Sequence, residues 1–370
     1  MYHTGFGGRA RTRFRLLFVK LVLAQRDDFV KVVIANFGKE VYPDHPVDYE
    51  SAWRGFSKPE SPQRSRLFEL EHDWGFHIFS IGVHLLDSGL ADEMEFWNFE
   101  PKRDFWWHRY GFYWMNFHNE QDLAGYLKTC RPPDLFIQYG GVSGRGVLRM
   151  LQGSSFRVYV PCLRSAEDEK GNFDAECFLV DDPVYLDQRS MMYIPVVNTE
   201  HVKPSATEKR FDFIYLAQAR PGKRHDIIIE AARETGMRGH FHPVEQGELD
   251  LQGTRITTTG FNTADPVALM QASRMAVYPG IGESSPAAMW ECVACDLPIV
   301  VNEAIAGGRH VVEPGVTGEL ARADSFAEVM RAMLANIKSY HPRDWLLAHW
   351  NTQAMLDRYL GFFREMGWRG

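Results

Sequence analysis

The sequence predicts an α/β protein with two domains, each built around a parallel sheet. Short apolar runs typical of buried strands alternate along the chain with helical segments, which is the pattern of strand–helix–strand units. The 370 residues are too many for one comfortable core, and the polar, patternless stretch 203–210 separates two such series. We therefore expect an N-terminal domain over 1–202, a C-terminal domain over 203–345, and a final helix over 346–370 that packs on both domains.

The first series is rich in aromatic residues. Strands are expected at 31–37, 134–139, 156–161 and 193–197, with helical periodicity over 65–89. The aromatic segment between Trp97 and Phe117 favours core or interdomain packing over a ligand platform, because large apolar side chains are usually buried.

The second series is more regular. Strands are expected at 211–217, 240–243, 255–260, 275–279 and 298–301. Helices are expected at 226–235, 265–273, 285–295, 325–340 and 344–368. Gly236 ends the first of these helices, and Asp265-Pro266 begins the second.

Composition limits the classes of function. A net charge of −7 makes a nucleic-acid substrate unlikely, because such proteins need a basic face. No apolar run reaches membrane-spanning length, and the basic segment 9–26 predicts a surface helix, with peripheral membrane contact as the alternative. Five cysteines, an odd number, favour a reducing compartment and hence a cytoplasmic protein. Cys292 and Cys295 are interpreted as small packing residues, since no nearby ligands complete a metal site.

Two carboxylates stand eight positions apart at Glu283 and Glu291. Glu283 follows a predicted strand and precedes a predicted helix, where open α/β sheets bind ligands and where backbone N–H groups suit phosphate. Taken alone, Glu283 would more often be a helix-capping acid. Glu291 lies in an apolar helix and needs a partner, from the protein or from a ligand. Eight helical residues span about 12 Å, enough for a sugar at one end and a ribose at the other.

Four ordered motifs in the second half resemble retaining glycosyltransferases of family 4, which have the two-Rossmann GT-B fold. The matching segments are 194–204, the strand–loop–helix 213–231, the acid-x7-acid element 283–291 with 297–300 after it, and the double-glycine segment 307–318. Together they cover about residues 190–335. The family glycine–arginine pair is replaced by Ala217-Gln218, and the glycine-rich loop after Glu283 by Ser-Ser-Pro.

The resemblance implies transfer of a sugar from a UDP- or GDP-sugar to a hydroxyl group, without a bound metal or cofactor. It implies that Glu283 contacts the sugar, that Glu291 binds the ribose, and that Arg220 and Lys223 neutralise the diphosphate. The remaining donor-binding residues that it implies are Ser284, Ser285, Pro286 and Ala287 at the helix start and Gly260 and Phe261 near the base.

The N-terminal domain would bind a glycan, lipid-linked or small-molecule acceptor. Its candidate contacts are Tyr139, Gly140, Gly141 and His118, although a plain turn and a packed histidine are equally compatible with the sequence. Two other functions stay open: a GT-B relative acting as an epimerase or phosphorylase, and a non-catalytic protein that binds nucleotide sugars.

Overall fold

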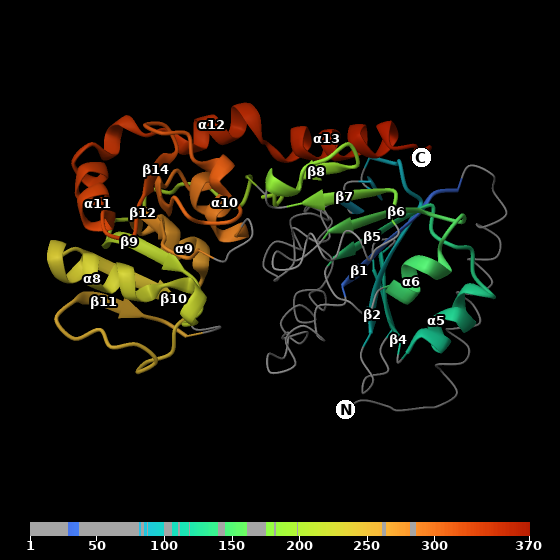
Figure 1. Ribbon diagram of the computed structural model, residues 1–370, viewed down its shortest axis with the longest axis horizontal. Coiled ribbons are helices and arrows are strands. Elements are labelled where there is room, and N and C mark those ends of the chain that lie inside the picture. The colour runs from blue at the N-terminus through green and yellow to red at the C-terminus, as the bar shows by residue number, and fades with distance from the viewer. Residues whose placement is uncertain are drawn as a thin grey trace.

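The protein, described here from a computed structural model, contains two separate sheets with helices around them (Figure 1). The structure describes residues 29–36, 81–82, 85–86, 88–99, 106–109, 112–117, 119–139, 145–160, 175–180, 183–197, 199–260, 264–281 and 286–370. The predicted basic segment 9–26 and most of the helical segment 65–89 lie outside these ranges.

The N-terminal sheet has eight strands in the order β3-β4-β2-β1-β5-β6-β7-β8. They are β1 (Lys31–Asn36), β2 (Glu93–Phe99), β3 (Trp106–Arg109), β4 (Phe112–Phe117), β5 (Leu135–Tyr139), β6 (Phe156–Val160), β7 (Cys177–Val180) and β8 (Ser190–Met192). Only β3 runs antiparallel to its neighbour, and the other pairs are parallel. Helices α5 (Glu120–Leu127) and α6 (Arg145–Met150) lie together beside this sheet.

The C-terminal sheet has six parallel strands in the order β11-β10-β9-β12-β13-β14. They are β9 (Phe211–Leu216), β10 (Arg238–His242), β11 (Arg255–Thr258), β12 (Ser273–Tyr278), β13 (Ile299–Asn302) and β14 (Gly318–Ala321). The surrounding helices are α8 (His225–Thr235), α9 (Pro266–Gln271), α10 (Ala287–Ala294) and α11 (Phe326–Ala335). The predicted two-sheet α/β fold is therefore confirmed.

The strand expected at 193–197 is wrong, because β8 ends at Met192. The hydroxyl group of Tyr359 accepts from the Ile194 N–H at 2.6 Å and donates to the Ile194 carbonyl at 2.7 Å. Pro195 next to it has no N–H to donate to a ladder. The apolar run is buried as predicted, but it crosses toward the second sheet with its backbone bonded to a side chain.

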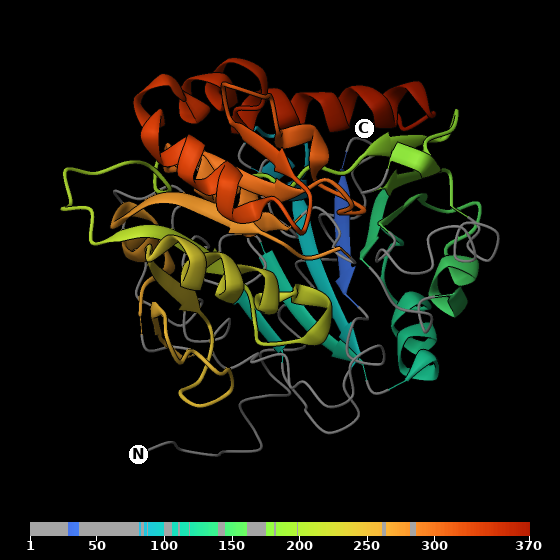
Figure 2. The same ribbon diagram turned by 60° about the vertical axis from the view of Figure 1, so that its left-hand side comes forward.

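The single helix expected over 344–368 is two helices, α12 (Pro342–His349) and α13 (Thr352–Glu365). Asn351 begins the second helix, since its side chain accepts from the Ala354 N–H at 2.9 Å. Helix α13 runs back along the N-terminal sheet (Figure 2), where Phe363 lies 6.2 Å from Phe156, ring centre to ring centre. The predicted crossing of the C-terminal helix is confirmed.

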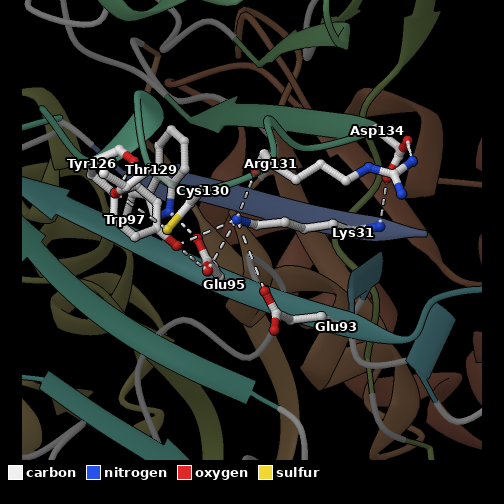
Figure 3. A network of polar contacts seen from close by, with 9 residues as sticks. All are labelled: Lys31, Glu93, Glu95, Trp97, Tyr126, Thr129, Cys130, Arg131 and Asp134. Carbon is white, nitrogen blue, oxygen red and sulfur yellow. Dashed lines mark hydrogen bonds and ion pairs between the residues drawn. The ribbon is translucent and has the colours of Figure 1, made fainter. Parts of the chain in front are cut away.

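A buried polar network lies at the amino-terminal edge of the first sheet (Figure 3). The Lys31 ammonium is 3.1 Å from the Glu95 carboxylate and 3.9 Å from that of Glu93, and all three side chains are almost fully buried. Glu95 also accepts from the indole N–H of Trp97 and the hydroxyl of Tyr126. Because Tyr126 belongs to α5, the network fixes this helix to the sheet, at the edge opposite the carboxyl ends of the strands.

Candidate active site

The C-terminal sheet has a topological switch point between β9 and β12. From β9 the chain proceeds to β10 and β11 on one side, and then crosses to β12, β13 and β14 on the other. The loops leaving β9 and β12 therefore diverge at the carboxyl edge of the sheet, which is the place where open α/β sheets bind ligands. The first of these loops carries Arg220 and Lys223, and the second leads to Glu283 and α10.

The basic loop after β9 is held by its own backbone. It forms the 3-10 helix η5 (Pro221–Lys223), in which the Lys223 N–H donates to the Arg220 carbonyl at 2.9 Å. Arg224 then takes a left-handed conformation with φ of 53°. Its guanidinium pairs with the exposed Asp226 carboxylate at 2.8 Å, which raises the pKa of Arg224 through the hydrogen bond. Arg224 is thus a solvated loop charge, whereas Arg220 and Lys223 lie at the switch point.

Helix α10 carries Glu291 among buried apolar side chains. Met289, Trp290 and Cys292 are buried, while Glu291 keeps some exposure. Burial nevertheless raises the pKa of its carboxyl group to about 7. Within the described ranges, no side chain forms an ion pair or hydrogen bond with this carboxyl group, so nothing there offsets the cost of ionising it.

Cys292 and Cys295 pack as the small apolar residues that the sequence indicated. Both are buried free thiols, and burial raises the pKa of Cys295 to about 12. The Tyr278 hydroxyl lies 3.4 Å from the Cys292 sulfur, which joins β12 to α10 beneath the switch point.

The stem of the loop after β12 is fixed by Asn302, the last residue of β13. Its buried amide donates to the Pro279 carbonyl at 2.8 Å and accepts from the Ala304 N–H at 2.9 Å. The Ala306 N–H donates to the Ile281 carbonyl at 3.2 Å. Sequence patterns did not indicate Asn302, because an asparagine at a strand end is usually only a turn residue.

The loop itself lies partly outside the described residues. Glu283, Ser284 and Ser285 are among those not described. Pro286 is described as the residue before α10, with no side-chain cap on the helix, and Ala287 is its first residue. The first turn of α10 therefore leaves backbone N–H groups for a ligand or for the preceding loop.

The turn at Gly260, which is predicted to lie near the base, contacts a further acid, Glu245. Gly260 is buried, and a β-carbon there would collide with the carboxylate of Glu245. The Val244 N–H donates to the Thr259 carbonyl at 2.9 Å, so the loops after β10 and β11 lie together at the carboxyl edge. Phe261 lies outside the described residues. Glu245 was missed by the sequence analysis because it belongs to no motif.

The N-terminal sheet has its own switch point, between β1 and β5. Tyr139 is the last residue of β5, where it is buried 5.9 Å from the Tyr193 ring, and burial raises the pKa of its hydroxyl group. Gly140, Gly141 and His118 lie outside the described residues.

An acid already faces the helix that follows the glycine loop. The Glu120 carboxylate occupies the space of a β-carbon on Gly146 in the first turn of α6. The negative charge that a helix start favours is therefore already supplied from α5.

The described residues contain no group of three or more potential metal ligands. None of the helices in the described ranges has both the length and the apolar character that a bilayer span requires.

Comparison with known proteins agrees with this arrangement. The profile of the family described as "Glycosyl transferases group 1" matches residues 210–336. No curated protein matched the chain in sequence.

Solved structures match the fold over nearly the whole chain. The sucrose-phosphate synthase of Thermosynechococcus elongatus is 14% identical, covers 91% of this chain and 99% of its own, and gives a TM-score of 0.66. The Anabaena protein HepE in complex with UDP is 12% identical over 91% and 100% of the two chains, with a TM-score of 0.62. The lipopolysaccharide outer core galactosyltransferase WaaB is 13% identical over 91% and 99%, with a TM-score of 0.61. These likenesses show the GT-B fold, and the segment 210–336, which contains the whole C-terminal sheet, is similar to the glycosyl transferases of group 1.

Proposed function

We propose that this protein is a glycosyltransferase of group 1 that transfers a sugar from a UDP- or GDP-sugar to a hydroxyl group with retention of anomeric configuration. One observation carries the proposal: the switch point between β9 and β12 brings the basic loop 217–224 and the acid-bearing helix α10 to the same carboxyl edge. Cations and a carboxylate at one crevice suit a ligand that has both a diphosphate and free hydroxyl groups. HepE, which has this fold, was solved in complex with UDP.

Each group at the edge has a separate role in this proposal. Glu291 accepts hydrogen bonds from the two ribose hydroxyls, because one carboxylate offers two acceptor oxygens to neighbouring donors. Arg220 and Lys223 neutralise the diphosphate. Ser284, Ser285, Pro286 and Ala287 are the proposed donor contacts at the start of α10, where backbone N–H groups suit phosphate. Glu283 contacts hydroxyl groups of the transferred sugar.

The remaining predicted contacts lie toward the base and the acceptor. Gly260 and Phe261 border the base. Tyr139, Gly140, Gly141 and His118 are the proposed contacts from the N-terminal sheet.

The chemistry follows from the charge that develops as the glycosidic bond breaks. Negative charge grows on the diphosphate oxygens, and fixed cations and N–H groups stabilise it more in the transition state than in the ground state. The leaving diphosphate, on the face from which it departs, takes the proton of the acceptor hydroxyl, so the new bond forms on that same face. These residues suffice for the chemistry without a resident metal.

The donor can be identified before the acceptor is known. A thermal-shift panel of UDP- and GDP-sugars should raise the unfolding temperature for the true donor, since a ligand of the folded state stabilises it by mass action. Turnover of that donor is then compared in wild type, Glu283→Gln and Arg224→Gln. Transfer should fall steeply in the first variant and stay near wild type in the second, which removes the cation of the same loop that pairs with the exposed Asp226.

Acceptor dependence separates transfer from the alternatives. A glycosyltransferase needs an acceptor hydroxyl and gives a product of the donor's anomeric configuration, which NMR measures. An epimerase acts without an acceptor, and a phosphorylase needs inorganic phosphate. Unchanged transfer by Glu283→Gln, or turnover without any acceptor hydroxyl, would contradict the proposal.

A further inference from the structure

Two buried side chains beneath the basic loop have no place in the proposed chemistry. Tyr215 on β9 is fully buried and His225, the first residue of α8, is 4% exposed. Their rings lie 4.7 Å apart, centre to centre, and both contact Phe241 on β10. They lie at the two ends of the loop 217–224: Tyr215 is near the end of β9, where the loop begins, and His225 is at the start of α8, where the loop ends.

Both side chains bond to the backbone of this loop. The Tyr215 hydroxyl donates to the Lys223 carbonyl at 2.7 Å. The Nε2 atom of His225 lies 3.3 Å from the Ala217 carbonyl, so it carries the proton and donates. The bond from Tyr215 therefore fixes Lys223 at the end of η5. The bond from His225 connects the start of α8, where the loop ends, to Ala217, where the loop begins.

The histidine is neutral in this arrangement. Burial lowers the pKa of His225 to about 4, and its Nδ1 atom is buried with no hydrogen-bond partner. A second proton on Nδ1 would add an unsatisfied buried charge. The imidazole of His225 therefore makes one hydrogen bond to the protein, from its Nε2–H to the Ala217 carbonyl, and this bond joins the two ends of the loop.

The backbone bonds of η5 by themselves hold only one turn of the loop. Arg224 holds a left-handed conformation that a non-glycine residue adopts at some cost, and its side chain bonds only to the exposed Asp226 within the described residues. Each bond from the sheet or from α8 to this loop reduces the backbone arrangements it samples, and so lowers the cost of ordering its cations when a ligand binds. The bonds from Tyr215 and His225 hold the loop in place before binding.

We propose that Tyr215 and His225 are positioning residues that pre-order the loop carrying Arg220 and Lys223 for a donor diphosphate. The inference rests on the proposed function, because it assigns these residues to the same nucleotide-sugar site. Neither side chain touches the donor. They act through the Lys223 and Ala217 carbonyls, and they contribute to affinity by removing the cost of ordering the loop.

The test measures how much the second phosphate adds to binding. Isothermal titration at one pH gives Kd for UDP, UMP, GDP and GMP, and the quantity compared is the ratio of the monophosphate Kd to the diphosphate Kd. In Tyr215→Phe and His225→Leu this ratio should fall about fivefold, the equivalent of one hydrogen bond. His225→Gln, whose amide N–H reaches toward the Nε2 position, should restore most of it.

Tyr359→Phe is the matched control, because it also removes a buried hydroxyl bonded to backbone, but far from the loop. It should lower stability and leave the ratio unchanged. If Tyr215→Phe leaves the ratio of monophosphate Kd to diphosphate Kd unchanged, the inference is overturned. Tyr215→Phe keeps the packing of the ring, so it gives this answer even if His225→Leu does not fold. If Lys223→Gln lowers the ratio while the tyrosine and histidine variants do not, only this inference fails. If wild type binds neither diphosphate, the proposed function fails with it.

Discussion

Glu291 gives the sharpest prediction, because its carboxyl group has a pKa of about 7 when no ligand is bound. If the carboxylate form accepts the ribose hydroxyls, binding requires ionisation, and the apparent affinity follows the ionised fraction. That fraction is about one tenth at pH 6, one half at pH 7 and nine tenths at pH 8. The Kd of the bound nucleoside diphosphate should therefore decrease about tenfold between pH 6 and pH 8.

Glu291→Gln removes the charge and the titration but keeps the shape. Its Kd at pH 8 should be about 10- to 100-fold weaker than that of wild type, as expected for loss of a hydrogen bond to a charged group. Titration calorimetry with UDP and GDP from pH 6 to pH 8 measures both effects. A terminal phosphate also titrates near pH 6, and the variant shows that contribution alone.

The reasoning is refuted if the two proteins have parallel pH profiles. A second readout comes from the proton released on binding. At pH 7 wild type should release about half a proton more than the variant, seen as heats that depend on the ionisation enthalpy of the buffer. Equal proton release would show that Glu291 does not ionise on binding, whatever the change in affinity.

Three further outcomes follow from the structure. Lys223→Gln should weaken nucleoside diphosphate binding about 10- to 100-fold, while Arg224→Gln should change it less than about twofold; calorimetry that ranks the two equally would contradict the assignment. Tyr359→Phe should lower the free energy of unfolding in urea by about 1–3 kcal/mol, because a buried N–H and a buried carbonyl lose their partner. Burial lowers the pKa of His225 and His240 from 6.5 to about 4. The unfolded chain then binds more protons between these values, so stability should be complete above pH 6.5 and fall by up to about 3 kcal/mol per histidine toward pH 4; unfolding curves that do not change from pH 7 to pH 4.5 would refute this.

The C-terminal sheet could be predicted almost strand by strand, because its inner strands β9, β12 and β13 are mostly buried and contain short apolar runs. The strand expected at 275–279 is β12 at Ser273–Tyr278, and that at 298–301 is β13 at Ile299–Asn302. Strand β14 was missed, since Gly318–Ala321 contains a glycine and a glutamate and has no apolar run. The position of β14 is set by its pairing with β13, and a local sequence pattern does not contain information on this pairing.

The N-terminal sheet was harder to predict, because its inner strands β1 and β2 contain buried charges. Strand β2 contains Glu93 and Glu95, whose burial depends on Lys31, 62 and 64 positions earlier. A sequence pattern treats such acids as exposed. The burial of Glu93 and Glu95 can be explained only when Lys31 on the neighbouring strand β1 is known.

The candidate site was predicted through its motifs, whereas the residues that support it were not. Tyr215, His225 and Asn302 act through bonds to backbone carbonyls, and any backbone can accept such a bond, so no spacing in the sequence reveals it. Glu283 and Glu291 could be proposed because eight positions separate them across a predicted strand-to-helix turn, a pattern that is visible without the fold.

The supporting residues also sharpen the interpretation of the site. At the carboxyl edge of the C-terminal sheet, the Tyr215 hydroxyl is bonded to Lys223, the Asn302 amide to Pro279, and the Tyr278 hydroxyl faces Cys292. Within the described residues Glu291 differs from these groups, because its carboxyl group has no ion pair or side-chain hydrogen bond. A carboxyl group kept near its ionisation point in an apolar helix gains most from a ligand that donates hydrogen bonds. The two neighbouring hydroxyls of a ribose are such donors. A diphosphate attached to that ribose would need cations, and Arg220 and Lys223 supply them from the neighbouring loop, which Tyr215 and His225 bond to the protein beneath it.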